Sequence, residues 1–240
     1  MRQDGFSLVE LSIVLVILGL LTGGILTAQN LIRAAELRSI TTEYQAYQTA
    51  VMTFRDRYMA LPGDMRNATD FWGSAGGAGT IGDGCEVATG TGTQTCNGNN
   101  DGTIPPSGAA ASEYQERFTF WQHLANAGLI EGGYSGKAGS GGGSHAISGE
   151  NVPASKMSNA LWYASYYGQG HSGNGSIVGG LYGNYLFVGS PRTNTWPTGR
   201  ILTTSEMWNI DKKIDDAKPM RGKVITFWWD DCSDGTSPTD

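Results

Sequence analysis

Residues 11–32 read LSIVLVILGLLTGGILTAQNLI and contain no charged side chain. At a rise of about 1.5 Å per residue, a helix over this stretch is about 33 Å long, which is enough to cross the hydrocarbon core of a bilayer. The run is too long for a cleaved signal peptide, and no A-x-A cleavage site follows it. The sequence therefore predicts a membrane-spanning helix that stays in the mature protein.

A single acidic residue, Glu10, lies at the start of this run. A carboxylate in a hydrocarbon-length segment is costly, since insertion scales give about 2.5–3.5 kcal/mol for an Asp at the centre of a helix. Cleavage after Gly5 would create a positive partner, the new amino group of Phe6. The alternative is that Glu10 reaches the headgroups from the end of the helix.

The segment from Gly5 to Gly19, GFSLVELSIVLVILG, resembles the cleavage and methylation motif of type IV pilins and of type II secretion pseudopilins. The resemblance implies that a prepilin peptidase cuts between Gly5 and Phe6 and that the Phe6 amine is methylated. It implies that Glu10 pairs with the Phe6 amine of a neighbouring subunit. The partners implied are further copies or other pilins, the prepilin peptidase and an inner-membrane assembly platform.

The chain departs from many members of this family because it has no proline around Thr27, where the helix often kinks. Gly19, Gly23 and Gly24 are candidate substitutes, since each lowers helix propensity by about 1 kcal/mol relative to alanine.

Beyond the apolar run, hydrophobic residues recur at spacings of three and four, which predicts that the helix continues with one amphipathic face. Leu61-Pro62-Gly63-Asp64 is expected to end it. The face comprises Leu37, Ile40, Tyr44, Tyr47, Val51, Phe54 and Tyr58. Off this face we expect the polar residues Glu36, Arg38, Glu43, Gln45, Gln48, Arg55 and Asp56.

The remainder alternates between Gly-rich tracts and short periodic segments. Long loops are predicted at residues 73–108 and 132–149, with a helix at 113–127 between them. A strand is expected at 181–188, a helix start at Thr203 to Glu206, and a second β-rich run at 223–229. The predicted fold class is α+β and pilin-like, with a long amino-terminal helix packed on a small antiparallel sheet. Patches at 60–64, 71–73, 121–130 and 210–216 also resemble a branch of pilin-like proteins and extend the likeness along the chain.

Charge and cysteine content restrict the partners and the compartment. The formal net charge is −6 and the pI about 5.0, without a cluster of Lys and Arg, so no nucleic acid is expected as a partner. If the domain lies outside the cytoplasm, a bridge between Cys85 and Cys96 is favoured over other pairings, which leaves Cys232 free. The acidic residues near the end are interpreted mainly as a solvated face or tail. They are Asp211, Asp215, Asp216, Asp230, Asp231, Asp234 and Asp240.

Residues 97–104, NGNNDGTI, are similar to the first half of a calcium-binding loop, with Asn97, Asn99 and Asp101 as candidate ligands. Gly108 stands where such loops carry an acidic twelfth residue. The two interpretations of this segment are therefore a calcium site and an ordinary Asn/Gly turn. No other cofactor is expected.

No catalytic motif stands in a suitable context, so we expect no enzymatic activity. Residues 77–82 fit GxGxxG but lack a preceding strand and a following helix. Residues 170–174 resemble a nucleophile elbow except that Asn174 replaces its last glycine. The aromatic residues Trp162, Tyr163, Tyr166 and Tyr167 are interpreted as core or subunit contacts.

These observations predict four segments: a leader at 1–5, a membrane and filament-core helix at 6–32, its amphipathic continuation at 33–60 and an extracytoplasmic domain at 61–240. Arginines on both sides of the span leave the positive-inside count ambiguous, so the orientation comes from the resemblance. The expected function is a structural subunit of a type IV pilus or similar filament, held in the inner membrane as a precursor. The alternatives are a periplasmic type II secretion pseudopilin and a minor or tip pilin that acts as an adhesive binding module.

Overall fold

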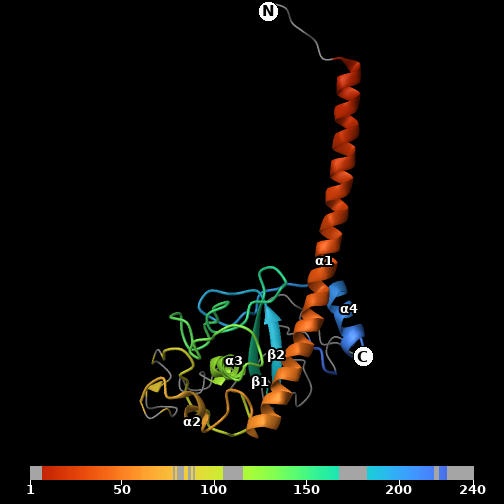
Figure 1. Cartoon of the computed structure of the whole chain (residues 1–240). Coiled ribbons are helices and arrows are strands. Elements are labelled where there is room, and N and C mark those ends of the chain that lie inside the picture. Colours follow the sequence, from red (N-terminus) through yellow and green to blue (C-terminus); the bar gives the residue numbers. More distant parts are fainter. Residues whose placement is uncertain are drawn as a thin grey trace, which may run out of the picture.

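A computed structural model of the chain describes residues 7–77, 79, 84–85, 88, 90–104, 116–167, 183–218 and 222–225. A long helix, α1, forms the axis, and the other elements gather beside its carboxyl-terminal half (Figure 1). The elements are α1 (Leu8–Tyr58), α2 (Ala68–Trp72), α3 (Glu116–Asn126), β1 (Leu161–Tyr167), β2 (Gly183–Gly189) and α4 (Thr204–Ile214). The fold is α+β and pilin-like, as the sequence predicts.

The end of α1 follows from local backbone chemistry. Met59 adopts a left-handed conformation with φ of 54°, and its N–H donates to the carbonyl oxygen of Arg55 at 2.8 Å. Such a cap satisfies a carbonyl group that would otherwise lack a partner at the last turn. Pro62, three residues further on, cannot continue a helix. The predicted stop around Leu61 is therefore correct to within a few residues.

The predicted apolar face of α1 does pack on the domain. Ile40 and Phe54 are buried in the core, and the other five residues of the face are partly buried against it. Full burial of a side chain such as Phe54 contributes about 1.5–3 kcal/mol relative to leaving it in water. The spacing of three and four residues thus correctly predicts which face of the helix contacts the domain.

Glu43 is the exception to the predicted polar face, because it is 8% exposed instead of solvated. Its carboxylate accepts hydrogen bonds from Ser155 Oγ at 2.7 Å, Lys156 N at 2.6 Å and Trp162 Nε1 at 2.7 Å. A buried charge is tolerated when several donors satisfy it. Glu43 therefore joins α1 to β1 and to the loop before it.

The strands β1 and β2 form a two-stranded antiparallel sheet in which Leu161 pairs with Gly189 and Tyr167 with Gly183. Trp162 of β1 meets Tyr47 of α1, with ring centroids 5.4 Å apart. The next residue, Tyr163, meets Phe118 of α3 at 5.9 Å. Because successive side chains point to opposite faces of a strand, both faces of β1 are covered.

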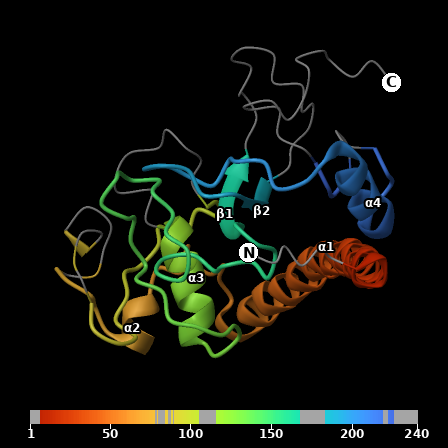
Figure 2. The same ribbon diagram turned by 90° about the horizontal axis from the view of Figure 1, so that it is seen from above.

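The helix α3 contacts both β1 and α1, and in the view along the axis it lies beside the sheet (Figure 2). Trp121 of α3 is fully buried, and its ring meets Tyr47 of α1 edge-on at 5.1 Å. Aromatic pairs of this geometry contribute about 0.5–1.5 kcal/mol beyond the area that they bury. Tyr47 thus touches both α3 and β1 and packs against the buried core.

On its other side α1 contacts α4 (Figure 2). The predicted helix start at Thr203 is present and forms a capping box, since Glu206 N donates to Thr203 Oγ1 at 3.3 Å and Thr203 N to Glu206 Oε2 at 2.8 Å. Glu206 also accepts from Arg33 of α1, with Nε at 2.6 Å and Nη2 at 2.8 Å. Arg33 Nη2 further donates to the carbonyl oxygen of Ile201 at 2.8 Å. These contacts connect α4 to the helix just beyond its apolar run.

Several sequence predictions need correction. The strand β1 was not predicted, because its residues are buried on both faces and show no polar alternation. Residues 223–225 are not a strand, and 226–229 lie outside the described residues, as do 113–115 and 181–182 of the two other predicted elements. Asp211 is buried instead of solvated, because α4 turns it into the protein.

Candidate functional site

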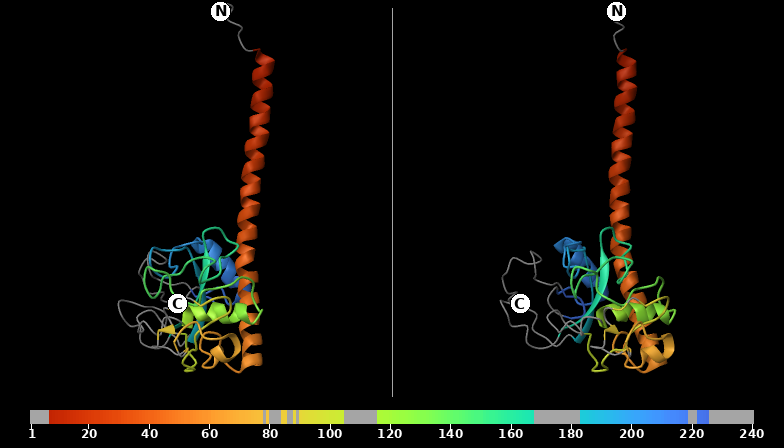
Figure 3. Two further views of the ribbon diagram at one scale, coloured as in Figure 1. Left: turned by 60° about the vertical axis from the view of Figure 1, so that its left-hand side comes forward. Right: turned by 90° about the vertical axis from the view of Figure 1, so that its left-hand side faces the viewer.

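The amino-terminal half of α1 stands apart from the domain (Figure 3). Residues 7–32 are all exposed, including large apolar side chains such as Leu8, at 86% exposure, and Ile32, at 61%. Within the described residues, α1 is the one helix long and apolar enough to cross a membrane. Water is an unfavourable solvent for so much apolar surface, so this half requires lipid or other helices around it.

The start of α1 places Glu10 in a capping box. Ser7 N donates to Glu10 Oε2 at 2.8 Å, and Val9 N donates to Ser7 Oγ at 3.3 Å. The carboxylate also lies where the partial positive charge of the helix amino terminus favours an anion. Glu10 therefore has a neutral hydrogen-bond donor within its own chain, which does not neutralise its charge.

Gly19, Gly23 and Gly24 lie in the exposed half of α1, and a Cβ built on any of them would meet nothing within 4 Å. The fold of a single chain therefore gives no packing reason for glycine there. Gly19 and Gly23 are spaced as in GxxxG, a pattern that lets apolar helices approach closely.

Gly5 and Phe6, the predicted cleavage and methylation positions, lie outside the described residues. Glu10 thus lies in the first turn of α1, two residues after Leu8, where the exposed apolar half of the helix begins.

The comparisons with known proteins agree with this geometry at the amino terminus. The family model for the prokaryotic N-terminal methylation motif matches residues 1–26. The chain carries the signature of the type IV pilins and pseudopilins. No curated protein and no solved structure matches the chain significantly. The match covers the segment that contains Gly5, Phe6 and Glu10 and most of the exposed apolar half of α1.

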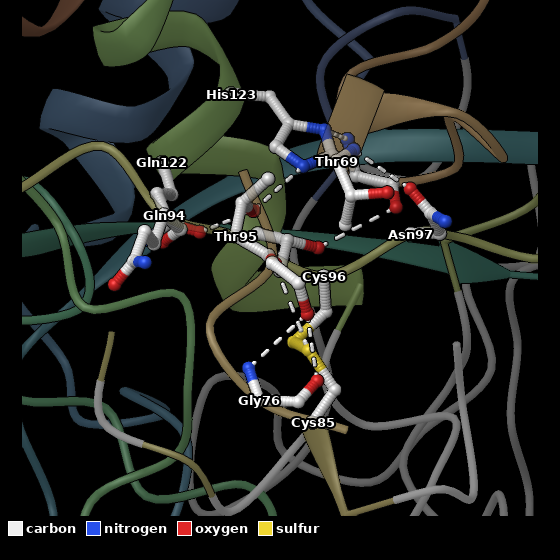
Figure 4. The surroundings of a disulfide bond; sticks show 12 residues. Thr69, Gly76, Cys85, Gln94, Thr95, Cys96, Asn97, Gln122 and His123 are labelled. Atoms are coloured by element: carbon white, nitrogen blue, oxygen red, sulfur yellow. Dashed lines mark hydrogen bonds between the residues drawn. A yellow bond between two sulfur atoms is a disulfide. The ribbon is translucent and has the colours of Figure 1, made fainter. Parts of the chain in front are cut away.

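A second group of residues surrounds a disulfide bond in the domain (Figure 4). Cys85 and Cys96 are bonded, with their Cα atoms 5.9 Å apart, so the pairing that the sequence favours is present. Both residues are buried. Cys232 lies outside the described residues.

Beside this disulfide a directional chain of hydrogen bonds crosses the core (Figure 4). Gly63 N donates to His123 Nδ1 at 3.0 Å, so the ring proton is on Nε2, which lies 3.0 Å from Thr95 Oγ1. Thr95 Oγ1 donates to Gln122 Oε1 at 2.5 Å, and Gln122 Nε2 donates to the carbonyl oxygen of Gln94 at 2.9 Å. Burial lowers the pKa of His123 to about 3, so the ring is neutral. This network is structural, and it fixes α3 to the loop that carries Cys96.

The close approach at Gly63 explains the residue type there. Its φ is +86°, and a Cβ would clash with the backbone oxygen of Glu116. Only glycine accepts this conformation and contact without strain.

The predicted calcium ligands lie in a loop that satisfies its own polar groups. Asp101 Oδ1 accepts from Thr103 N and Oγ1, both at 2.7 Å, and Asn99 Nδ2 donates to Asp101 Oδ2 at 2.9 Å. Burial opposes ionisation of Asp101, but these hydrogen bonds outweigh it and lower its pKa. Asn97 Oδ1 instead accepts from Thr69 N at 2.9 Å. The geometry is that of consecutive Asx turns, in which two of the three candidate ligands are brought together.

Asp64, which was not predicted as a site residue, supports this loop from outside. It accepts from Asp101 N at 3.0 Å and from Gly102 N at 2.9 Å. Burial raises the pKa of Asp64, and these amide donors oppose the shift. Asp64 follows directly on the Pro-Gly stop of α1, but no sequence spacing relates it to residues 101–102.

The remaining motifs gain no support as sites. Residues 78 and 80–82 of the GxGxxG match and all of 170–174 lie outside the described residues. Trp162 and Tyr163 are core residues, as interpreted from the sequence, and Tyr166 is half-buried in β1. A sequence signal that was missed is the S-x-x-E pattern from Ser7 to Glu10, which is a capping-box signature.

Proposed function

We propose that this protein is a structural subunit of a type IV pilus or a similar filament. Prepilin peptidase removes residues 1–5, the Phe6 amine is methylated, and subunits assemble through residues 6–32. Residues 33–60 connect this segment to an extracytoplasmic domain at 61–240. The precursor is held in the inner membrane before an assembly platform extracts it.

One observation carries the proposal: α1 is buried by the domain only in its second half, while residues 7–32 are uncovered. A 51-residue helix of this kind can be surrounded by lipid in the precursor and by other copies of itself in a filament. Gly19 and Gly23 favour close helix packing in that second state.

Glu10 supplies the register in this proposal. Its hydrogen bond from Ser7 N leaves the negative charge uncompensated, and a charge surrounded by apolar helices is costly without a counter-charge. The Phe6 amine of a neighbouring subunit provides that counter-charge. A subunit that enters in the wrong register leaves both groups unpaired.

The structure suggests three variants that separate charge from helix capping. Glu10→Gln keeps an acceptor for Ser7 N but loses the charge, Glu10→Ala loses both, and Ser7→Ala keeps the charge but loses one capping group. We expect both Glu10 variants to be inserted in the membrane and processed but not assembled, whereas Ser7→Ala assembles. The measurements are filament yield after shearing and the mass of the mature amino terminus.

Normal filament yield from Glu10→Gln would refute the role of the charge. A mature chain that still begins at Met1, or one without a methylated Phe6, would refute the proposed processing. Filaments that appear only in the periplasm would identify the pseudopilin alternative, and a subunit that is rare in purified filaments would identify the minor or tip alternative.

A further inference from the structure

The carboxyl end of α4 brings three carboxylates together. One oxygen each from Asp211, Asp215 and Asp216 lies within 4.8 Å of the others. The end of a helix also carries partial negative charge, so acidic groups are unfavourable there. Repulsion among these groups calls for a positive partner.

Asp211 differs from an ordinary surface acid because it is 0% exposed. Both of its carboxylate oxygens are buried and have no hydrogen-bond partner in the part of the chain that the structure describes. Burial, together with the Asp216 and Asp215 carboxylates, raises its pKa. The backbone amide of Ala217 opposes this shift. A buried carboxylate without a partner is rare and calls for an explanation, and a bound ion is one.

The two neighbouring acids are held in place by backbone amides. Asp216 Oδ1 accepts from Lys218 N at 2.9 Å, and Asp215 Oδ2 accepts from Lys223 N. Each hydrogen bond uses one oxygen and leaves the second available, so the amides orient the acids without neutralising them.

Side-chain cations of the described residues do not pair with the group either. Among the described residues, the carboxylates of Asp211, Asp215 and Asp216 form no salt bridge. Lys212 adjoins Asp211 in sequence, but its Nζ lies 5.0 Å from the centre of the Trp208 ring. No described side chain therefore supplies the positive partner, and Arg221 lies outside the described residues.

We propose that Asp211, Asp215 and Asp216 bind a divalent cation, and that this cation is calcium. Calcium takes six to eight oxygen ligands in flexible geometry, and carboxylates, backbone carbonyls and water are its usual ligands. The last carbonyl groups of α4 and water complete the set, because helix ends present such groups without intrahelical partners. The site is separate from the loop at residues 97–104 and does not depend on filament assembly.

Calorimetric titration of the full-length protein in detergent micelles with calcium chloride tests this site. We expect binding with a Kd of about 0.1–1 mM, the range of extracellular calcium modules. Asp216→Asn, at an exposed position where asparagine keeps an acceptor for Lys218 N, should weaken binding by at least about tenfold, a loss seen even for residues behind the ligands of metal sites. Asp56→Asn, an exposed acid on α1, is the matched control and should bind as the parent protein does.

Thermal unfolding gives a second readout, because Asp211→Asn should change the unfolding temperature relative to the parent protein differently in EDTA and in calcium. In EDTA, Asp211→Asn should unfold at a higher temperature than the parent protein, because it removes an unpaired buried charge. In millimolar calcium the parent protein should gain stability and the variant should not. A parent protein without a calcium response, or Asp216→Asn with unchanged affinity, would overturn the proposal. A response that Asp101→Asn abolishes and Asp211→Asn retains would also overturn it, since the ion would then lie in the loop at 97–104.

Discussion

Trp162 Nε1 donates a hydrogen bond of 2.7 Å to Glu43 Oε2, and this bond joins the first strand to the long helix inside the core. Ser155 Oγ and Lys156 N donate to the same carboxylate. Side-chain and backbone donors from one segment thus converge on a single residue of α1. The domain is positioned along the helix by this polar contact as well as by apolar packing.

The contact predicts a large effect for Glu43→Ala. Three donors, two of them within one short loop, would lose their acceptor, and each hydrogen bond to a charged group contributes about 1.5–3 kcal/mol. We expect the free energy of unfolding to fall by about 3 kcal/mol or more, measured by denaturant titration of the full-length protein. Gln45→Ala, two residues away on the exposed face, is the control and should change it by less than about 0.5 kcal/mol. Equal effects of the two substitutions would contradict this account.

The ion pair of Arg33 and Glu206 predicts a dependence of stability on pH. Hydrogen bonding from Arg33 lowers the pKa of Glu206 from 4.5 to about 2. A carboxyl group whose pKa is lower in the folded state contributes stability that is complete above its unfolded pKa. This contribution should be lost as the pH falls from about 4.5 towards 2.

The variant Glu206→Gln isolates this pH effect, because glutamine keeps the capping box with Thr203 but cannot ionise. We expect the unfolding midpoints of the two proteins to converge between pH 4.5 and 2, with the parent protein more stable above this range. A constant difference over the whole series would show that Arg33 does not act through the charge of Glu206.

His123 predicts a spectroscopic result. Its ring accepts from Gly63 N at Nδ1 and is buried, so the neutral form with the proton on Nε2 should persist from pH 8 down to about 4. Nitrogen chemical shifts of the imidazole in the labelled protein would report both the tautomer and the protonation state. An unperturbed histidine titrates near 6.5, and a short histidine-containing peptide serves as the reference. Titration of His123 near that value would contradict the network.

The same shift sets the sign of a stability effect. A histidine whose folded pKa is below its unfolded value favours the neutral state, so its contribution is complete above about pH 6.5 and declines as the pH falls below it. His123→Gln should reduce that dependence, although it also disturbs the hydrogen-bond chain to Thr95.

Features with a local sequence signal could be predicted from the chain alone. The apolar face from Leu37 to Tyr58 follows from its period, and the start of α4 follows from the T-x-x-E box at Thr203. The membrane segment follows from length and the absence of charge. Each of these depends on residues within a few positions of one another.

Features that depend on distant residues could not be predicted in this way. Glu43 was assigned to solvent because its three donors, at 155, 156 and 162, lie more than a hundred positions away. The strand β1 was missed because helices cover both of its faces, so its sequence has no alternation. Asp211 was placed in a solvated tail because composition does not report which side of α4 faces the protein.

Arg33 is the first residue after the exposed half of α1 whose side chain is hydrogen-bonded to the domain. Since α1 is one unbroken helix, a force applied along its axis at the amino-terminal end reaches Arg33 before it reaches Glu43 or the aromatic core. In the proposed filament, tension between subunits would therefore be transmitted first to α4, through the bond between Arg33 and Glu206. The contacts of Glu43 and of the aromatic residues with β1 lie further along the helix, so the load would reach the sheet after it reaches α4.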